Sequence, residues 1–121
     1  METAYEAKLS ERKEVLKDFF GGYEGEDIPD DLLMRLFQYE ELMIKYRSAI
    51  REITTKLHIL NDELSVFTKH NPIENIQSRV KRPYSIAKKL SKQGQPVTVE
   101  AISAHLNDVA GIRIICPFIS D

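Results

Sequence analysis

The stretch that decides the fold is PDDLLMRLFQYEELMIKYRSAIREITTKLHILNDELSVF, residues 29–67. From Leu32 to Phe67 its apolar side chains recur in alternating steps of four and three residues, a heptad spacing kept for about five repeats. This spacing predicts one long helix. The proline and two aspartates that open the stretch suit a first helical turn, since proline lacks an N–H that would have no partner there and carboxylates stabilise the positive helix end. The pattern leaves open whether the apolar stripe packs in a core or forms an oligomer contact.

Three shorter helices are expected on either side of this stretch, at residues 5–20, 83–92 and 99–106. Gly21 stops the first of them, before an acidic linker at residues 24–27. Gly94 closes the second, and Thr98 suits the N-cap of the third because its hydroxyl can accept a free backbone N–H. The chain is therefore expected to be mostly helical.

A strand is expected at residues 110–118, AGIRIICPF, where β-branched residues form an apolar run between a glycine and a proline. It is the only convincing strand in the sequence, and a lone strand leaves its backbone donors and acceptors unpaired. We therefore expect an α+β fold whose other strands lie in a missing part of a truncated protein or in partner chains, and truncation is the favoured explanation. Ser120-Asp121 resembles the cap of a further helix.

The net charge of −2 conceals one concentrated basic segment. Residues 77–99 contain no acidic residue but hold six of the 17 lysines and arginines, so the rest of the chain is acidic. This distribution favours a local anion site over a broad nucleic-acid surface. The single cysteine, Cys116, excludes a disulfide framework, and no apolar run approaches the roughly 20 residues that span a bilayer, so a cytoplasmic protein is expected.

The basic segment has the spacing of a phosphate cradle. Arg79 and Lys81 project to one side if that stretch is extended, and Ser85, Lys88 and Lys89 lie near one face of the following helix. The N-terminus of that helix adds free N–H groups and a positive dipole end. A solvated lysine-rich helix face would give the same pattern and remains an alternative.

The entrance to the strand carries a second group of candidates, Asp108, Gly111 and Arg113. A carboxylate beside a phosphate cradle suits Mg²⁺, which prefers oxygen ligands and shares itself with substrate phosphates. Gly111 permits a close backbone approach or an unusual dihedral angle. A structural ion pair between Asp108 and Arg113 is the alternative.

Together the two groups form a specific pattern: Arg-x-Lys-x-x-x-Ser-x-x-x-Lys, followed after a helix by Asp-x-x-Gly-x-Arg-Ile. With the flanking His70-Asn71-Pro72-Ile73-Glu74 and the strand residues 112–116, it resembles the synthetase domain of the RelA/SpoT family, in particular the small single-domain alarmone synthetases. The resemblance covers roughly residues 40–121. Residues 1–38 match no family motif and are expected to form an N-terminal helical extension. For residues 39–121 the resemblance implies an incomplete synthetase domain, with a nucleotidyltransferase-like mixed sheet flanked by helices.

The activity that the resemblance implies is that of a GTP diphosphokinase, a transferase of the stringent response. Such an enzyme moves pyrophosphate from ATP to the 3′-hydroxyl of GDP or GTP, giving ppGpp or pppGpp. By analogy Arg79 and Arg113 stack on adenine, Lys81 and Lys89 with Ser85 hold the ATP phosphates, and Lys88 joins them with a less defined role. Asp108 would bind Mg²⁺, so that Asp108, Lys81 and Lys89 are the catalytic candidates. Small members of the family are typically tetramers, which the heptad helix would suit.

Two family elements are absent from this sequence: a Glu-x-Gln-x-Arg-Thr segment with a second acidic residue, and a tyrosine-bearing loop that stacks on guanine. We therefore expect little or no synthesis by this polypeptide alone. The alternative function is a non-catalytic module that forms oligomers or binds RNA. Tyr84 is the only aromatic residue among the cations, which weakens the RNA alternative.

Overall fold

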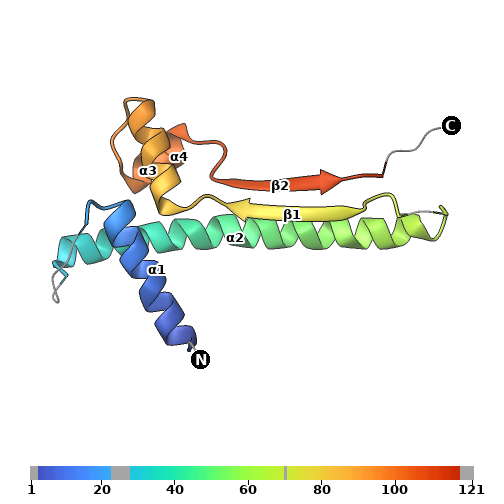
Figure 1. Ribbon diagram of the computed structural model, residues 1–121, viewed down its shortest axis with the longest axis horizontal. Helices are drawn as coiled ribbons and strands as arrows, with labels where there is room; N and C mark the ends of the chain where they lie inside the picture. Colours follow the sequence, from blue (N-terminus) through green and yellow to red (C-terminus); the bar gives the residue numbers. More distant parts are fainter. Residues whose placement is uncertain (1–2, 23–27, 70, 118–121) are drawn as a thin grey trace. The chain divides into compact units, whose positions relative to one another are not determined.

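The computed structural model describes residues 3–22, 28–69 and 71–117, and Figure 1 shows the elements in chain order. They are α1 (Ala4–Asp18), α2 (Asp30–Ser65), β1 (Asn75–Val80), α3 (Pro83–Lys92), α4 (Val99–His105) and β2 (Ala110–Ile115). The expected acidic linker, the end of the expected strand at Phe118 and the cap at Ser120-Asp121 lie outside the described residues. No helix in the described ranges is long and apolar enough to cross a membrane.

The chain divides into two compact units, and each is described by itself. The first contains Met1–Met43 and Lys81–Val109, and therefore α1, the first part of α2, α3 and α4. The second contains Ile44–Val80 and Ala110–Asp121, and therefore the rest of α2 and both strands.

The first unit holds all the buried apolar side chains recorded for the described residues. They come from every helix of the unit and from residues just beyond α1 and α4: Val15, Leu16, Phe19, Leu36, Tyr39, Met43, Ile86, Leu90, Ala101, Ile102, Leu106 and Val109. The Phe19 ring packs on Phe20 and Tyr39, with both centroids 4.9 Å away. Arg12 of α1 forms a two-bonded ion pair with Glu40 of α2, at 2.6 and 3.3 Å, which fixes α1 against α2.

Local capping sets the helix ends much as expected. The Thr98 hydroxyl accepts the Ala101 N–H at 3.1 Å, and Gly94 adopts φ +70 just beyond α3, a conformation that few other residues take. The end of α2 differs from the expectation, because the helix stops at Ser65 and leaves Phe67, 84% exposed, outside it. The Ser65 hydroxyl bonds to the Asp62 carbonyl at 2.7 Å, and such local bonds compete with helix continuation.

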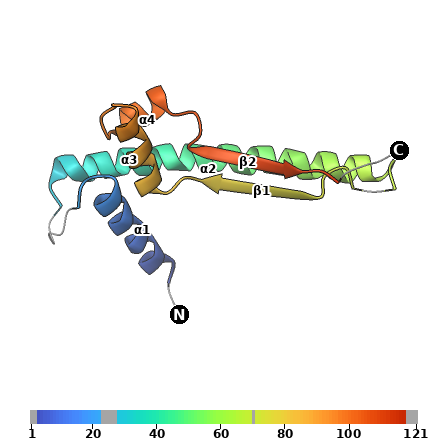
Figure 2. The same ribbon diagram turned by 45° about the horizontal axis from the view of Figure 1, so that its top comes forward.

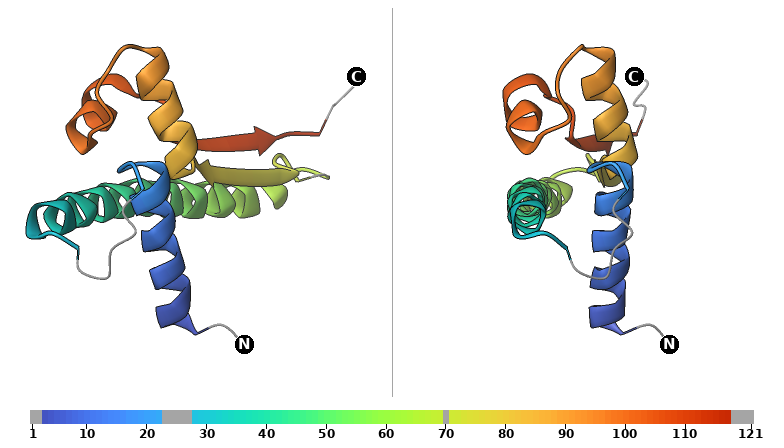
Figure 3. Two further views of the ribbon diagram at one scale, coloured as in Figure 1. Left: turned by 60° about the vertical axis from the view of Figure 1, so that its left-hand side comes forward. Right: turned by 90° about the vertical axis from the view of Figure 1, so that its left-hand side faces the viewer.

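The expectation that the strand is alone was wrong. In the second unit β1 pairs antiparallel with β2 in the register Asn75↔Ile115 to Val80↔Ala110, and Figures 1 and 2 show the two strands side by side. The second part of α2 runs in the same direction as this hairpin in Figures 1 and 2 and in the left view of Figure 3. The α+β class and the mostly helical character are confirmed, with an antiparallel pair as the described part of the sheet.

The side chain of Asn61 holds the loop that connects α2 to β1. The Asn61 amide oxygen accepts the Ile73 N–H at 2.9 Å, and its amide nitrogen donates to the Ile73 carbonyl at 3.2 Å. The asparagine thus bonds to both polar groups of the Ile73 backbone, as a neighbouring strand would. One residue later, the Glu74 N–H bonds to the Ile115 carbonyl at 2.8 Å and starts the ladder.

Heptad spacing has different consequences in the two units. In the first unit its residues Leu36, Tyr39 and Met43 are buried in the core. In the second unit Ile53 and Leu60 are 49% and 46% exposed. The core interpretation therefore holds for the first part of α2, and the second part keeps an exposed apolar stripe.

Candidate functional site

Lys81, Lys89 and Asp108, the three catalytic candidates, lie together in the first unit. Lys81 follows the end of β1, and its backbone N–H bonds to the Val109 carbonyl at 2.7 Å. Val109 is 1% exposed, so it anchors this point of the chain in the core. Its neighbour Asp108 is thereby held beside Lys81.

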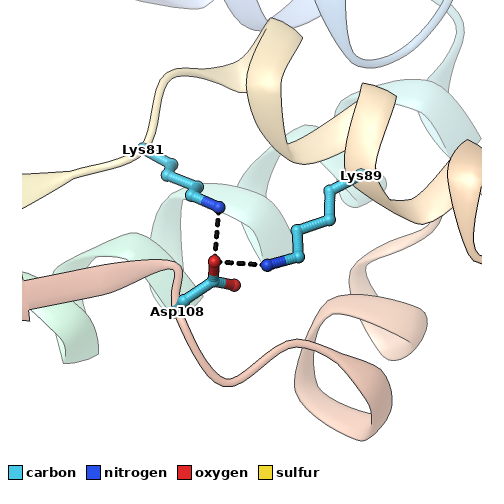
Figure 4. A network of polar contacts seen from close by, with 3 residues as sticks. All are labelled: Lys81, Lys89 and Asp108. Carbon is cyan, nitrogen blue, oxygen red and sulfur yellow. Dashed lines mark hydrogen bonds and ion pairs between the residues drawn. The ribbon is translucent and has the colours of Figure 1, made fainter.

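The third member of the cluster, Lys89, comes from α3. The apolar side chains of Ile86 and Leu90 are fully buried and set the rotation of this helix about its axis. Lys89, three residues after Ile86 and next to Leu90, lies at the border of the buried face. Its ammonium group reaches across to Asp108 (Figure 4).

Both lysines donate to the same carboxylate oxygen. Lys81 Nζ lies 2.6 Å from Asp108 Oδ2, and Lys89 Nζ bonds to that oxygen as well (Figure 4). The Lys81 side chain is 17% exposed, whereas those of Lys89 and Asp108 are 37% and 47% exposed. The cluster is therefore open to a solute. Within the first unit, the ion-pair partners of Asp108 are the two lysines.

These contacts shift the titration of two of the groups. Hydrogen bonds from Lys81 first, and then from Lys89, lower the pKa of Asp108 from 3.8 to about 2, because they stabilise the charged carboxylate. The hydrogen bond to Asp108 raises the pKa of Lys89 for the same reason. At neutral pH the cluster holds two ammonium groups and one carboxylate, with an excess of positive charge.

The side chains available as metal ligands determine what kind of metal site this cluster could form. Among the residues that the structure describes, no group of three or more His, Cys, Asp or Glu side chains gathers to hold a metal ion. Asp108 offers the oxygen ligand that Mg²⁺ prefers, and Mg²⁺ commonly takes one or two protein carboxylates and completes its shell with substrate phosphates. The cluster therefore fits a magnesium ion shared with a bound phosphate, and it does not fit a cage made by the protein alone.

Ser85 and Lys88 are both exposed on α3. Ser85 lies one helical turn before Lys89, so a ligand at Lys89 can reach its hydroxyl. The cluster of bonded side chains consists of Lys81, Lys89 and Asp108, and the roles of Ser85 and Lys88 stay predictions.

In the second unit, Arg79 and Arg113 lie on one face of the hairpin. The register places Arg79 opposite Gly111 and Arg113 opposite Gln77, so the two arginines are diagonal neighbours on adjacent strands, and both are exposed. Gly111 is a regular strand residue whose φ is not positive, so the unusual dihedral angle suggested for it was wrong. A Cβ added there would meet no atom within 4 Å, which leaves the space beside Arg79 open.

Sequence reasoning missed two features that organise these residues. One is β1 itself, whose NIQSRV sequence alternates apolar and polar side chains only weakly and so carries no clear strand signal. The other is the convergence of both lysines on one oxygen. The ladder bond between Lys81 and Val109, 28 residues further on, produces it, and no local sequence signal marks that pairing.

Comparison with known proteins agrees with the pattern of these residues. Residues 78–121 match the family model described as "Region found in RelA / SpoT proteins". The chain is 39% identical over 92 residues to GTP pyrophosphokinase YwaC of Bacillus subtilis (strain 168), covering 76% of this chain and 44% of the relative. It is 33% identical over 85 residues to GTP pyrophosphokinase YjbM of the same organism, covering 69% of this chain and 38% of that relative.

Solved structures give the same result for the fold. Small alarmone synthetase 1 from Bacillus subtilis matches with a TM-score of 0.58 and 32% identity, over 68% of this chain and 43% of the other. The same enzyme bound to its product pppGpp matches with a TM-score of 0.58 and 33% identity, over 67% and 40%. The chain thus spans less than half the length of the relatives that it matches, and the predicted resemblance is confirmed for the part they share.

Proposed function

We propose that this chain provides the ATP-binding part of a GTP pyrophosphokinase, because residues 78–121 match the family model described as "Region found in RelA / SpoT proteins". The reaction transfers the β,γ-pyrophosphate of ATP to the 3′-hydroxyl of GDP or GTP and yields ppGpp or pppGpp. The observation that supports this proposal is the Lys81–Asp108–Lys89 cluster, because the resemblance assigns its two lysines to the ATP phosphates and its aspartate to Mg²⁺.

In this proposal Lys81 and Lys89 bind the ATP phosphates. Each ammonium group exchanges its bond to Asp108 for one to a phosphate oxygen and offsets the charge that builds up during transfer. The acceptor 3′-oxygen forms a bond to the β-phosphorus, the bond between that phosphorus and the α–β bridging oxygen breaks, and AMP leaves with the electron pair. Mg²⁺, when bound, would neutralise phosphate charge, with Asp108 as its protein ligand.

The proton of the acceptor hydroxyl needs a base. The resemblance assigns that role to the acidic residue of a Glu-x-Gln-x-Arg-Thr segment, which this sequence does not contain. We therefore expect the chain to bind ATP but to make little or no alarmone by itself.

Adenine stacking is the proposed role of Arg79 and Arg113. The backbone positions of diagonal neighbours on two antiparallel strands are about 7–8 Å apart. A flat ring in contact with a guanidinium on each face needs about twice the 3.5 Å contact distance, so the spacing suits a sandwiched base. The missing side chain at Gly111 leaves room for the edge of the ring.

ATP binding to the chain itself tests the proposal. Calorimetry with ATP and Mg²⁺ should show binding that is weakened about tenfold or more by Lys89→Ala, because a charge-assisted bond to phosphate is lost. Lys92→Ala is the matched control, since Lys92 is also an exposed lysine of α3 but has no place in the motif. Equal loss in both variants, or no binding by the wild-type chain, would contradict the phosphate site.

Alarmone synthesis needs a second assay. The full product of the reading frame should form ppGpp from radiolabelled ATP and GDP, and Asp108→Ala should abolish synthesis while leaving the thermal unfolding temperature nearly unchanged. An active Asp108→Ala enzyme would remove Asp108 from the reaction.

We also propose a cytoplasmic homo-oligomer, a tetramer by the resemblance, in which the second part of α2 is a subunit contact. The proposal is supported by three apolar side chains that are each close to half exposed on the second part of α2, Ile53, Ile59 and Leu60. Light scattering should give a mass above that of the 14.0 kDa chain, and Ile53→Glu should lower it. A monomeric wild type would contradict the proposal.

A further inference from the structure

A cavity of about 430 Å³ lies between the N-terminal helix and the start of α3, within the first unit. Lys13, Glu14 and Lys17 of α1 line one side of it, and Arg82 and Ser85 line the other. Ser85 is the hydroxyl residue of the proposed ATP site. The N-terminal helix, which the family motif does not include, therefore borders that site through its polar side chains.

Some of the charged side chains that line this cavity already bond to each other, and others are exposed to a ligand. The Glu14 carboxylate accepts a bond from Arg82 Nε at 3.1 Å, so those two charges are already paired. Lys13 and Lys17 lie one helical turn apart on α1 and are both exposed. Asp18 also lines the cavity and offsets one of the two lysines, which leaves a modest excess of positive charge.

The geometry points to an accessory phosphate subsite in which Lys13 and Lys17 bind a phosphate group of the nucleotide held at Ser85 and Lys89. Ser85 and Lys89 lie one turn apart on α3, so a polyphosphate at Lys89 passes the Ser85 hydroxyl and reaches the cavity. Of the described cations that line the cavity, Arg82 is the one held in an ion pair, and Lys13 and Lys17 are exposed there. This inference rests on the proposed function, since it takes Ser85 as a phosphate-binding residue.

A pair of charge-matched double variants tests it on the chain as given. Lys13→Gln with Lys17→Gln removes two positive charges from the cavity, whereas Lys8→Gln with Lys45→Gln removes two from exposed positions that do not line it. Calorimetry with ATP and Mg²⁺ at low ionic strength should give about fivefold weaker binding for the first variant, because exposed charge pairs contribute little each. The control should bind like the wild type. At about 0.5 M salt the difference should fall below twofold, because salt screens exposed charges.

The outcomes separate this inference from the proposed function. If the wild type binds ATP, Lys89→Ala weakens binding and both double variants bind alike, the accessory subsite is wrong and the ATP site stands. If both double variants lose the same affinity, the effect is one of net charge and the subsite is again wrong. If the wild type binds no ATP, the proposed site and the subsite fail together. Circular dichroism with thermal unfolding establishes that each variant is folded.

Discussion

Replacing Lys81 by methionine should raise the pKa of the Asp108 carboxyl. Lys81 is the largest cause of the lowered value, and its Nζ lies 2.6 Å from the carboxylate. With Lys89 still in place the pKa should rise only part of the way from about 2, and the double replacement of Lys81 and Lys89 should raise it to its ordinary value or slightly above, because only the desolvation that raises it remains. Methionine keeps most of the volume of the lysine stem, so the change isolates the charge.

The assay is a titration of the side-chain carboxyl carbon by ¹³C NMR, with backbone amide signals recording the folded state at each pH. Lys92→Met is the control, since it removes a charge from the same helix away from Asp108. A wild-type midpoint near 3.8, or an equal rise in Lys81→Met and Lys92→Met, would refute the ion-pair geometry.

The same shifts set the pH range in which the cluster stabilises the fold. The lowered pKa of Asp108 contributes stability that is fully present above about pH 4. This stability is lost as the pH falls through about 2. The raised pKa of Lys89 contributes stability that is present below its unfolded value of 10.5 and is lost as pH rises through the folded value. Because the Asp108 side chain is 47% exposed, its contribution should be about 1 kcal/mol or less.

Three further changes test the surrounding structure. Asn61→Ala should lower the free energy of unfolding, measured in urea, by about 1–2 kcal/mol, because both backbone groups of Ile73 lose their partner. Asn61→Asp keeps only the acceptor and should lose less, and an unchanged urea midpoint in Asn61→Ala would contradict the role of these two bonds. Gly111→Leu should weaken ATP binding about tenfold by filling the space for the adenine, while Gly111→Ala should fold normally because its Cβ meets nothing within 4 Å. Normal ATP binding by the leucine variant would contradict the placement of adenine on this face of the hairpin. Arg12→Met should lower stability by about 1 kcal/mol in thermal unfolding, because it removes the ion pair with Glu40 and the contact of Arg12 with an aromatic ring at 5.7 Å; an unchanged unfolding temperature would show that the pair contributes nothing.

The helices could be predicted because their signals are local. Pro83, Gly94 and Thr98 each act within one turn of the backbone, and the helix between Pro83 and Lys92 ends where expected. The end of α2 was placed too late because the heptad spacing continues to Phe67, beyond the point where side-chain hydroxyls bond to the last carbonyls. Apolar spacing gave the face of this helix but not its last residue.

The hairpin could not be predicted in the same way. β1 exposes asparagine, glutamine and arginine on one face and depends on a partner whose paired residues begin 30 positions later, from Val80 to Ala110. The candidate site was found because its residue types form a family pattern, and Lys81, Lys89 and Asp108 do meet. The single shared oxygen follows from how the end of the hairpin is paired at Val109, which is a tertiary property.

That shared oxygen has a thermodynamic consequence for ligands. An anion that draws Lys81 and Lys89 away would leave the Asp108 carboxylate facing negative charge, whereas a divalent cation at Asp108 would have to displace two ammonium groups. When the anion and the cation bind together, the cation neutralises the Asp108 carboxylate and the anion pairs with the displaced ammonium groups. Polyphosphate and metal should therefore bind with positive coupling, and by reciprocity each should raise the affinity of the cluster for the other by the same factor.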